Sequence, residues 1–138
     1  MGYFDESGSI LTDLLDKEAK ERAESFVSRQ SRYPKRLERG AGRTLTSAQL
    51  RRFFSEFRQL EKKVNVMGFD KVKPLIKMVK SKASYAANPA NPKIPHQFKK
   101  FLIENVDRIN SEEEFKAFML HFEAVVGFFY GIEGVSNR

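Results

Sequence analysis

Apolar residues recur along most of the chain at the three- and four-residue spacing of amphipathic helices, and no convincing apolar–polar alternation appears. This pattern predicts an all-α fold, a compact bundle of about five helices joined by short loops. We expect a single helical domain over residues 1–138. It would consist of a leading helical segment at 1–28, a basic connector at 29–43 and a helical core at 44–131.

Local start and stop signals set the expected helix boundaries at about 10–28, 46–68, 70–87, 95–109 and 111–131. Thr46 with Gln49, and Ser111 with Glu114, each have the spacing of a capping box. Pro74 is compatible with the third helix if it falls in the first turn, where no backbone donor is needed. These signals favour helices over any alternative for the core.

Basic residues are concentrated in the middle of the chain. Residues 29–100 contain 19 Lys and Arg against 4 Asp and Glu, a net charge of +15, whereas 1–28 and 101–138 each carry −4. Six of the fifteen residues at 29–43 are basic, and Pro34, Gly40 and Gly42 interrupt any helix there, so we expect a mobile basic connector. This asymmetry favours a surface that binds a polyanion.

The basic residues of the second and third helices fall in rows. Positions on the second helix give two stripes, Arg51–Arg58–Lys62 and Arg52–Gln59–Lys63, and those on the third give Lys73–Lys77–Lys80–Ser84. Like charges at such spacings repel by a few tenths of a kcal/mol per pair, which a phosphate backbone would relieve. We expect the rows to border one groove if the two helices pack side by side.

The aromatic residues do not support a platform that stacks single-stranded bases. The chain has 13 Phe, nearly all at core spacing, and no Trp. Tyr85 and Met78 are the exceptions beside the lysine row, and a tyrosine there is more often a boundary residue between core and solvent. We therefore expect recognition of phosphate backbone and shape. Charge alone does not separate RNA from DNA, and an acidic protein partner would meet the same surface.

Residues for catalysis are scarce. The two histidines, His96 and His121, are the only candidates for a metal-independent ribonuclease, and we expect His96 to be exposed and His121 to lie near a polar helix edge. Glu112, Glu113 and Glu114 fit a first helical turn better than a carboxylate site. We expect no enzyme, no cofactor and no metal.

A helix-turn-helix DNA-binding regulator is the main competing interpretation. Against it, the sequence shows no obvious short turn linking the two most basic helices, and their charges are spread along them. The absence of cysteine is typical of a reducing cytoplasm. No apolar run reaches the ~18 residues of a membrane span, and the acidic start is unlike a secretory signal. We expect a cytoplasmic protein that does not enter a membrane.

Three blocks of the sequence resemble a known family: TLTSAQLRRFFSEFRQLE, LIKMVKSKASYAAN and FKAFMLHFEAVVGFFYG. They are similar to the small subunit of type III-A CRISPR effector complexes, the Csm small-subunit family, over about residues 44–131. The resemblance implies a non-catalytic helical protein of antiviral defence. It would be present in several copies beside other effector subunits, along the guide RNA and its target RNA.

The resemblance also implies RNA contacts by position. These are Arg51, Arg52, Lys77, Lys80 and Lys82. The helical-face argument adds Arg43 and Arg58.

Overall fold

The computed structural model describes residues 2–27, 44–90 and 92–132. In this part of the chain a short 3-10 helix, η1, precedes five α-helices; their bounds are η1 Thr12–Leu15, α1 Lys17–Ser25, α2 Ser47–Met67, α3 Phe69–Ala86, α4 His96–Arg108 and α5 Glu112–Tyr130. The described residues form no strand, only an isolated bridge between Phe4 and Ile10. The prediction of an all-α bundle is confirmed.

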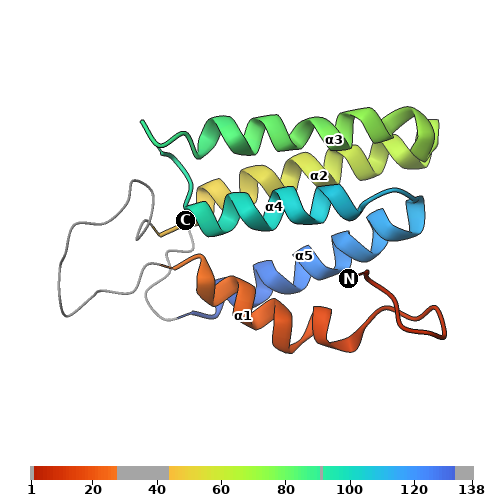
Figure 1. The fold of residues 1–138 in the computed structure, drawn as a ribbon, viewed down its shortest axis with the longest axis horizontal. Helices are drawn as coiled ribbons and strands as arrows, with labels where there is room; N and C mark the ends of the chain where they lie inside the picture. Colours follow the sequence, from red (N-terminus) through yellow and green to blue (C-terminus); the bar gives the residue numbers. More distant parts are fainter. Residues whose placement is uncertain (1, 28–43, 91, 133–138) are drawn as a thin grey trace.

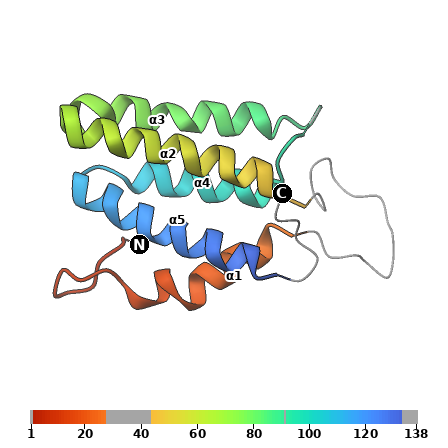
Figure 2. The same cartoon turned by 180° about the vertical axis from the view of Figure 1, so that it is seen from behind.

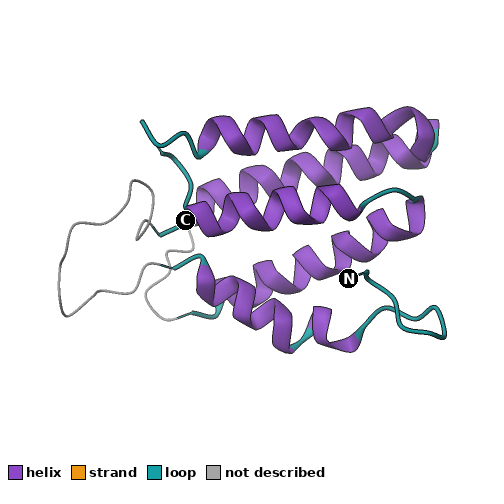
Figure 3. Ribbon diagram, viewed as in Figure 1, coloured by secondary structure: helices purple, strands orange, loops and turns teal. Residues whose placement is uncertain are grey.

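The helices lie roughly alongside one another, with α3 at one edge and α1 at the other (Figure 1). Between these edges, α4 lies nearer the viewer in Figure 1. In Figure 2, which shows the bundle from behind, α2 lies nearer the viewer. α3 packs against both α2 and α4, whereas α1 packs against α5. Loops join the helices at their ends (Figure 3). One broad side of the bundle therefore presents the outer surface of α2.

Phenylalanine rings fill the centre of the bundle. Phe98 and Phe101 of α4 meet Phe122 of α5 at ring-centroid distances of 6.3 and 5.4 Å. Around them, edge-to-face contacts bring in rings from the end of α1 and from α2; these are Phe26 on Phe98, Phe53 on Phe98 and Phe57 on Phe118. Such pairs each add about 0.5–1.5 kcal/mol beyond the burial of their area. The core is thus built mainly by α2, α4 and α5.

The prediction of one helix over about 10–28 is wrong in its first half. η1 ends at Leu15, and the next residue, Asp16, breaks the helical path before α1 begins, with a φ of −133° and a ψ of −102°. The break leaves Leu15 36% exposed while Leu14 is buried. Two separate segments cover α5 here instead of one straight helix. The basic connector predicted at 29–43, which includes Arg43, lies outside the described residues.

The caps of α2 and α5 follow the sequence signals closely. Thr46 and Gln49 form the full capping box, with N–H···O distances of 3.1 and 3.0 Å. At α5, the N–H of Glu114 donates to the Ser111 hydroxyl at 3.2 Å. The Glu114 carboxylate accepts from the backbone N–H of Asn110, not of Ser111. The second box is therefore confirmed in one half and shifted by one residue in the other.

A single glycine joins α2 to α3. Gly68 has a φ of 91°, a left-handed conformation that favours glycine, and its N–H donates to the Val64 carbonyl at 2.8 Å. α3 starts immediately afterwards at Phe69, so Pro74 lies in its second turn and not in the first as predicted. The carbonyl of Asp70 consequently has no helical N–H donor.

The start of the chain is anchored inside the bundle by Tyr3. Its ring is fully buried, and its hydroxyl is 2.9 Å from Oδ1 and 3.1 Å from the carbonyl oxygen of Asn105 on α4. Asn105 in turn donates to the Phe101 carbonyl at 2.8 Å. Burial raises the pKa of Tyr3 beyond its usual range, so the phenol stays protonated.

His121 lies inside the bundle and not at a polar edge as predicted. It is 1% exposed, and its Nδ1–H donates to the Leu14 carbonyl, where η1 meets α5. Burial lowers the pKa of His121, against opposing contributions from the Leu14 carbonyl and from Glu18, whose carboxylate lies 4.0 Å from Nε2. The neutral ring is therefore part of the packing.

Replacing Tyr3 with Phe should lower the free energy of unfolding by about 1–2 kcal/mol, because the buried Asn105 side chain loses its donor. Urea denaturation measures this. Tyr85→Phe removes a hydroxyl from an exposed ring and should change stability by less than about 0.5 kcal/mol. Equal effects of the two variants would mean that the buried hydrogen bond contributes nothing.

The buried imidazole should make the stability of the bundle sensitive to mild acid. With a lowered pKa in the folded state, His121 resists a proton that the unfolded chain accepts below its ordinary value of about 6.5. Stability is therefore full above that pH and falls as pH drops. His121→Asn should lose less unfolding free energy than the wild type between pH 7 and 5. Parallel stability profiles in the two proteins would contradict this role.

Candidate nucleic-acid interface

The outer face of α2 is exposed and basic. Side chains at helical spacing point to solvent there; they are Arg51, Arg52, Ser55, Gln59, Lys62 and Lys63. Arg52, Gln59 and Lys63 line a shallow hollow of about 330 Å³ together with Ser55 and Glu56. Arg52, Lys62 and Lys63 have no ion-pair partner within residues 2–27, 44–90 and 92–132. These charges are available to a ligand.

Both carboxylates of α2 are engaged at its flanks. Glu56 pairs with Lys82 of α3, and Glu61 pairs with Arg58 at 3.0 Å. Arg58 also lies 3.5 Å from Glu123 of α5 and stacks over the ring of Phe54, with its guanidinium carbon 4.9 Å from the ring centroid. Glu56 thus borders the hollow lined by Arg52 and Lys63, but its charge is paired with Lys82. Glu61 is paired on the flank of Arg58.

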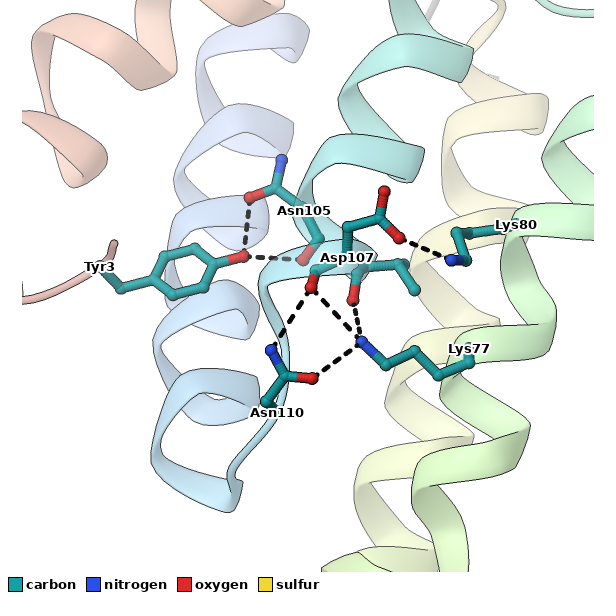
Figure 4. Close-up of polar contacts among 7 residues, drawn as sticks. Tyr3, Lys77, Lys80, Asn105, Asp107 and Asn110 are labelled. Carbon is teal, nitrogen blue, oxygen red and sulfur yellow. Dashed lines mark hydrogen bonds and ion pairs between the residues drawn. The ribbon is translucent and has the colours of Figure 1, made fainter. Parts of the chain in front are cut away.

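Two lysines of α3 are directed at the end of α4 (Figure 4). The ammonium of Lys77 donates to the Val106 carbonyl at 2.7 Å and lies 3.3 Å from Oδ1 of Asn110. Lys80 forms an ion pair with Asp107 at 2.5 Å. Partial burial, followed by repulsion from Lys73 and Lys80, lowers the pKa of Lys77. A cation at a helix C-terminus stabilises the unpaired carbonyls there.

The two basic rows do not border one groove, contrary to expectation. α2 and α3 do pack side by side, but α3 buries one stripe of its surface against α2 and α4; the buried residues are Phe69, Val72, Ile76, Val79 and Ala83. Because this stripe is buried, Lys77 and Lys80 point toward α4, and only Lys82 forms an ion pair on the side of α2. Hydrophobic burial sets the rotation of the helix, and the charges follow it.

The structure accounts differently for each predicted contact residue. Arg51 and Arg52 lie on the exposed face of α2, where Arg51 has a further contact of its own. Arg58, Lys77, Lys80 and Lys82 each have a polar partner inside the protein. Lys62 and Lys63, which were left out of the predicted contacts, belong to the same exposed face. Their stripes on the helix were visible in the sequence.

The remaining candidates for chemistry do not form a site. His96 is exposed at the start of α4, as predicted, whereas His121 is enclosed against η1, so the two rings do not share an accessible position. Glu112, Glu113 and Glu114 occupy the first turn of α5, as predicted. Over the described ranges, no group of three or more His, Asp or Glu is placed to hold a metal ion.

A second hollow of about 550 Å³ lies at the end of the bundle, between the Gly68 turn and the start of α5. Its lining mixes Lys71 with Asp70 and Glu112, so its charges do not select a polyanion. No helix in the described part of the chain is long and apolar enough to cross a membrane.

The connection between α2 and α3 is short, which corrects the expectation that no short turn joins the two most basic helices. The two helices nevertheless run alongside each other over their length (Figures 1 and 2). Helix-turn-helix readers instead join their helices at about 90–120°. The described geometry therefore gives that motif no support.

The chain matches no curated protein and no solved structure. It does match one family model, described as Csm2 Type III-A, over residues 14–132. This range includes every described helix except the first two residues of η1, and it includes the basic face of α2. The protein therefore belongs to the Csm2 Type III-A family, whose members are subunits of type III-A CRISPR effector complexes.

Proposed function

We propose that this protein is a non-catalytic, cytoplasmic small subunit of its effector complex that binds the backbone of guide and target RNA without reading the sequence. In this role it contacts other effector subunits and further copies of itself, and it contributes to antiviral defence. It carries no cofactor and catalyses no reaction. Membership of the family supports the setting, and the surface of α2 supports the RNA contact.

The observation that carries the proposal is the neutralisation of acid around α2. Its two carboxylates, Glu56 and Glu61, are each paired with a cation. Glu56 borders the hollow lined by Arg52 and Lys63, but Lys82 offsets its charge, so no unpaired acid of α2 opposes the Arg and Lys of the outer face. A phosphate backbone offers the negative charge that this face lacks, and release of counterions would add affinity. Arg and Lys contacts to phosphate position a strand without specifying its bases.

The predicted contact residues have graded roles in this proposal. Arg51 and Arg52 bind phosphate directly, together with Lys63. A phosphate contact at Arg43, outside the described residues, is proposed from the sequence alone. Lys80, Lys82 and Arg58 are ion-paired and exchange a carboxylate for a phosphate when RNA is bound. The Lys77 ammonium is already hydrogen-bonded to α4, so it contributes positive potential and holds α3 in place.

Changing Arg52 and Lys63 together to Ala should weaken RNA binding equally for unrelated sequences. Each phosphate contact to a single strand contributes about 0.7 to the slope of log affinity against log salt, so the slope should shrink by about 1.4. Fluorescence anisotropy of two unrelated single-stranded RNAs, each at several salt concentrations, measures both effects.

The matched control is Lys17→Ala with Lys20→Ala, which removes the same charge from exposed positions on α1. It should leave the slope close to that of the wild type. An equal loss in both double variants would point to net charge alone. A loss that depended on RNA sequence would contradict backbone recognition.

Replacing Lys77 with Met should affect stability more than RNA binding. The variant keeps the aliphatic stem but removes the donor to the Val106 carbonyl, at a cost of about 1–2 kcal/mol in unfolding free energy. Lys73→Met, one turn earlier on α3, removes a lysine without such a hydrogen bond in the described chain and should cost less than about 0.5 kcal/mol. Unchanged stability with abolished RNA binding would make Lys77 a direct contact.

A further inference from the structure

The most exposed ridge of α3 is nearly free of charge. Along it, side chains three and four residues apart point to solvent; they are Lys71, Pro74, Met78, Ser81 and Tyr85. Tyr85 is 74% exposed and Met78 is 50% exposed. They lie two turns apart, about 10 Å along the helix axis. The ridge thus presents an aromatic ring and a thioether to water.

Tyr85 is not the boundary residue that its position in the sequence suggests. A boundary tyrosine buries its ring and exposes only its hydroxyl, whereas most of this ring is exposed. Of the other described aromatic residues only Phe4 is exposed, at 36%, and it lies in the bridge to Ile10. The other described rings are fully or partly buried apart from that of Phe4, and no packing within the described chain explains the position of Tyr85.

Cations border the ridge on both sides. Lys82 lies on the flank toward α2, whereas Lys77 and Lys80 lie on the flank toward α4. The only acidic residue in α3 is Asp70, which lies in the first turn of the helix, whereas Tyr85 lies in the last turn. A ligand lying along the ridge therefore meets positive charge at its edges and an apolar surface beneath it.

The shape of the ridge selects among ligands. Protein partners anchor their side chains in concave, desolvated pockets, which the convex surface of a single helix does not offer. A nucleobase needs no pocket, because it can stack on an exposed aromatic ring through its flat face, whatever its identity. Bases in a duplex are already stacked on one another, so only unpaired bases can do this.

We propose that Tyr85, assisted by Met78, is a stacking platform for unpaired bases of RNA whose phosphates follow the lysines of α3. This inference rests on the proposed function and deepens it, because it makes single-stranded RNA the preferred form. Stacking tolerates any base, so the preference is for strandedness and not for sequence.

The test uses a single-stranded RNA carrying 2-aminopurine, whose fluorescence falls when the base stacks on an aromatic ring. Saturating wild-type protein should quench the probe, and Tyr85→Phe should quench it as well. Tyr85→Ala should abolish the quenching and weaken single-strand binding about 5-fold or more. Its affinity for an RNA duplex, measured by anisotropy, should stay at the wild-type value.

Phe4→Ala is the matched control, because it removes the other exposed aromatic side chain among the described residues, in a segment outside α3. This variant should quench the 2-aminopurine fluorescence and bind single-stranded RNA as the wild-type protein does. Circular dichroism should show unchanged helix content in every variant, since Tyr85 is exposed.

The possible failures are distinguishable. If the wild-type protein binds RNA without quenching, or Tyr85→Ala binds single strands normally, the platform is overturned and the proposed function stands. If Tyr85→Ala weakens duplex and single-strand binding alike, the ring does not act by stacking and the platform is again overturned. If the wild type binds no RNA even at low salt, the proposed function fails and this inference fails with it.

Discussion

The arrangement of this bundle depends on the packing of phenylalanine rings between α4 and α5. Phe98, Phe101 and Phe122 form its centre, and rings from α2 and from the end of α1 meet them edge-to-face. Within the described chain α3 contributes no ring to these ring–ring contacts and packs through Phe69 and aliphatic side chains instead. Because nearly all described phenylalanine rings are committed to the core, an exposed aromatic ring such as that of Tyr85 stands out on the surface.

The lysines of α3 have a structural role as well as a place on the basic surface. Gly68 ties one end of the helix to α2, and Lys77 and Lys80 bind the C-terminal end of α4. From the opposite side, Tyr3 holds the same part of α4 through Asn105 (Figure 4). The end of α4 is thus a junction at which segments distant in sequence satisfy each other's polar groups. Positive charge on α3 serves the fold first and a ligand second.

Patterns within one helix predicted most of the fold, and contacts between helices account for what they missed. The capping box at Thr46 and the buried face of α2 depend on neighbouring residues, so the sequence shows them directly. The break at Asp16 and the burial of His121 arise where η1 meets α5, and the anchoring of Tyr3 arises where the start of the chain meets α4. No local sequence pattern records such contacts. Likewise, the sequence of α3 showed that its lysines form a row. The rotation of the helix, which turns that row toward α4, follows from hydrophobic contacts with α2 and α4.

The distinction between committed and available cations explains why charge alone overstates a binding surface. Lys77, Lys80, Lys82 and Arg58 contribute to the positive balance of the chain, yet each already has a partner in the bundle. Pairs at the protein surface are worth little individually, so a phosphate can displace a carboxylate from Lys80 or Lys82 at small cost. The Lys77 ammonium faces backbone carbonyls that would lose their donor, and its release costs more. A strand that follows the basic side of this protein should therefore be held first by the outer face of α2 and recruit the flanking lysines afterwards.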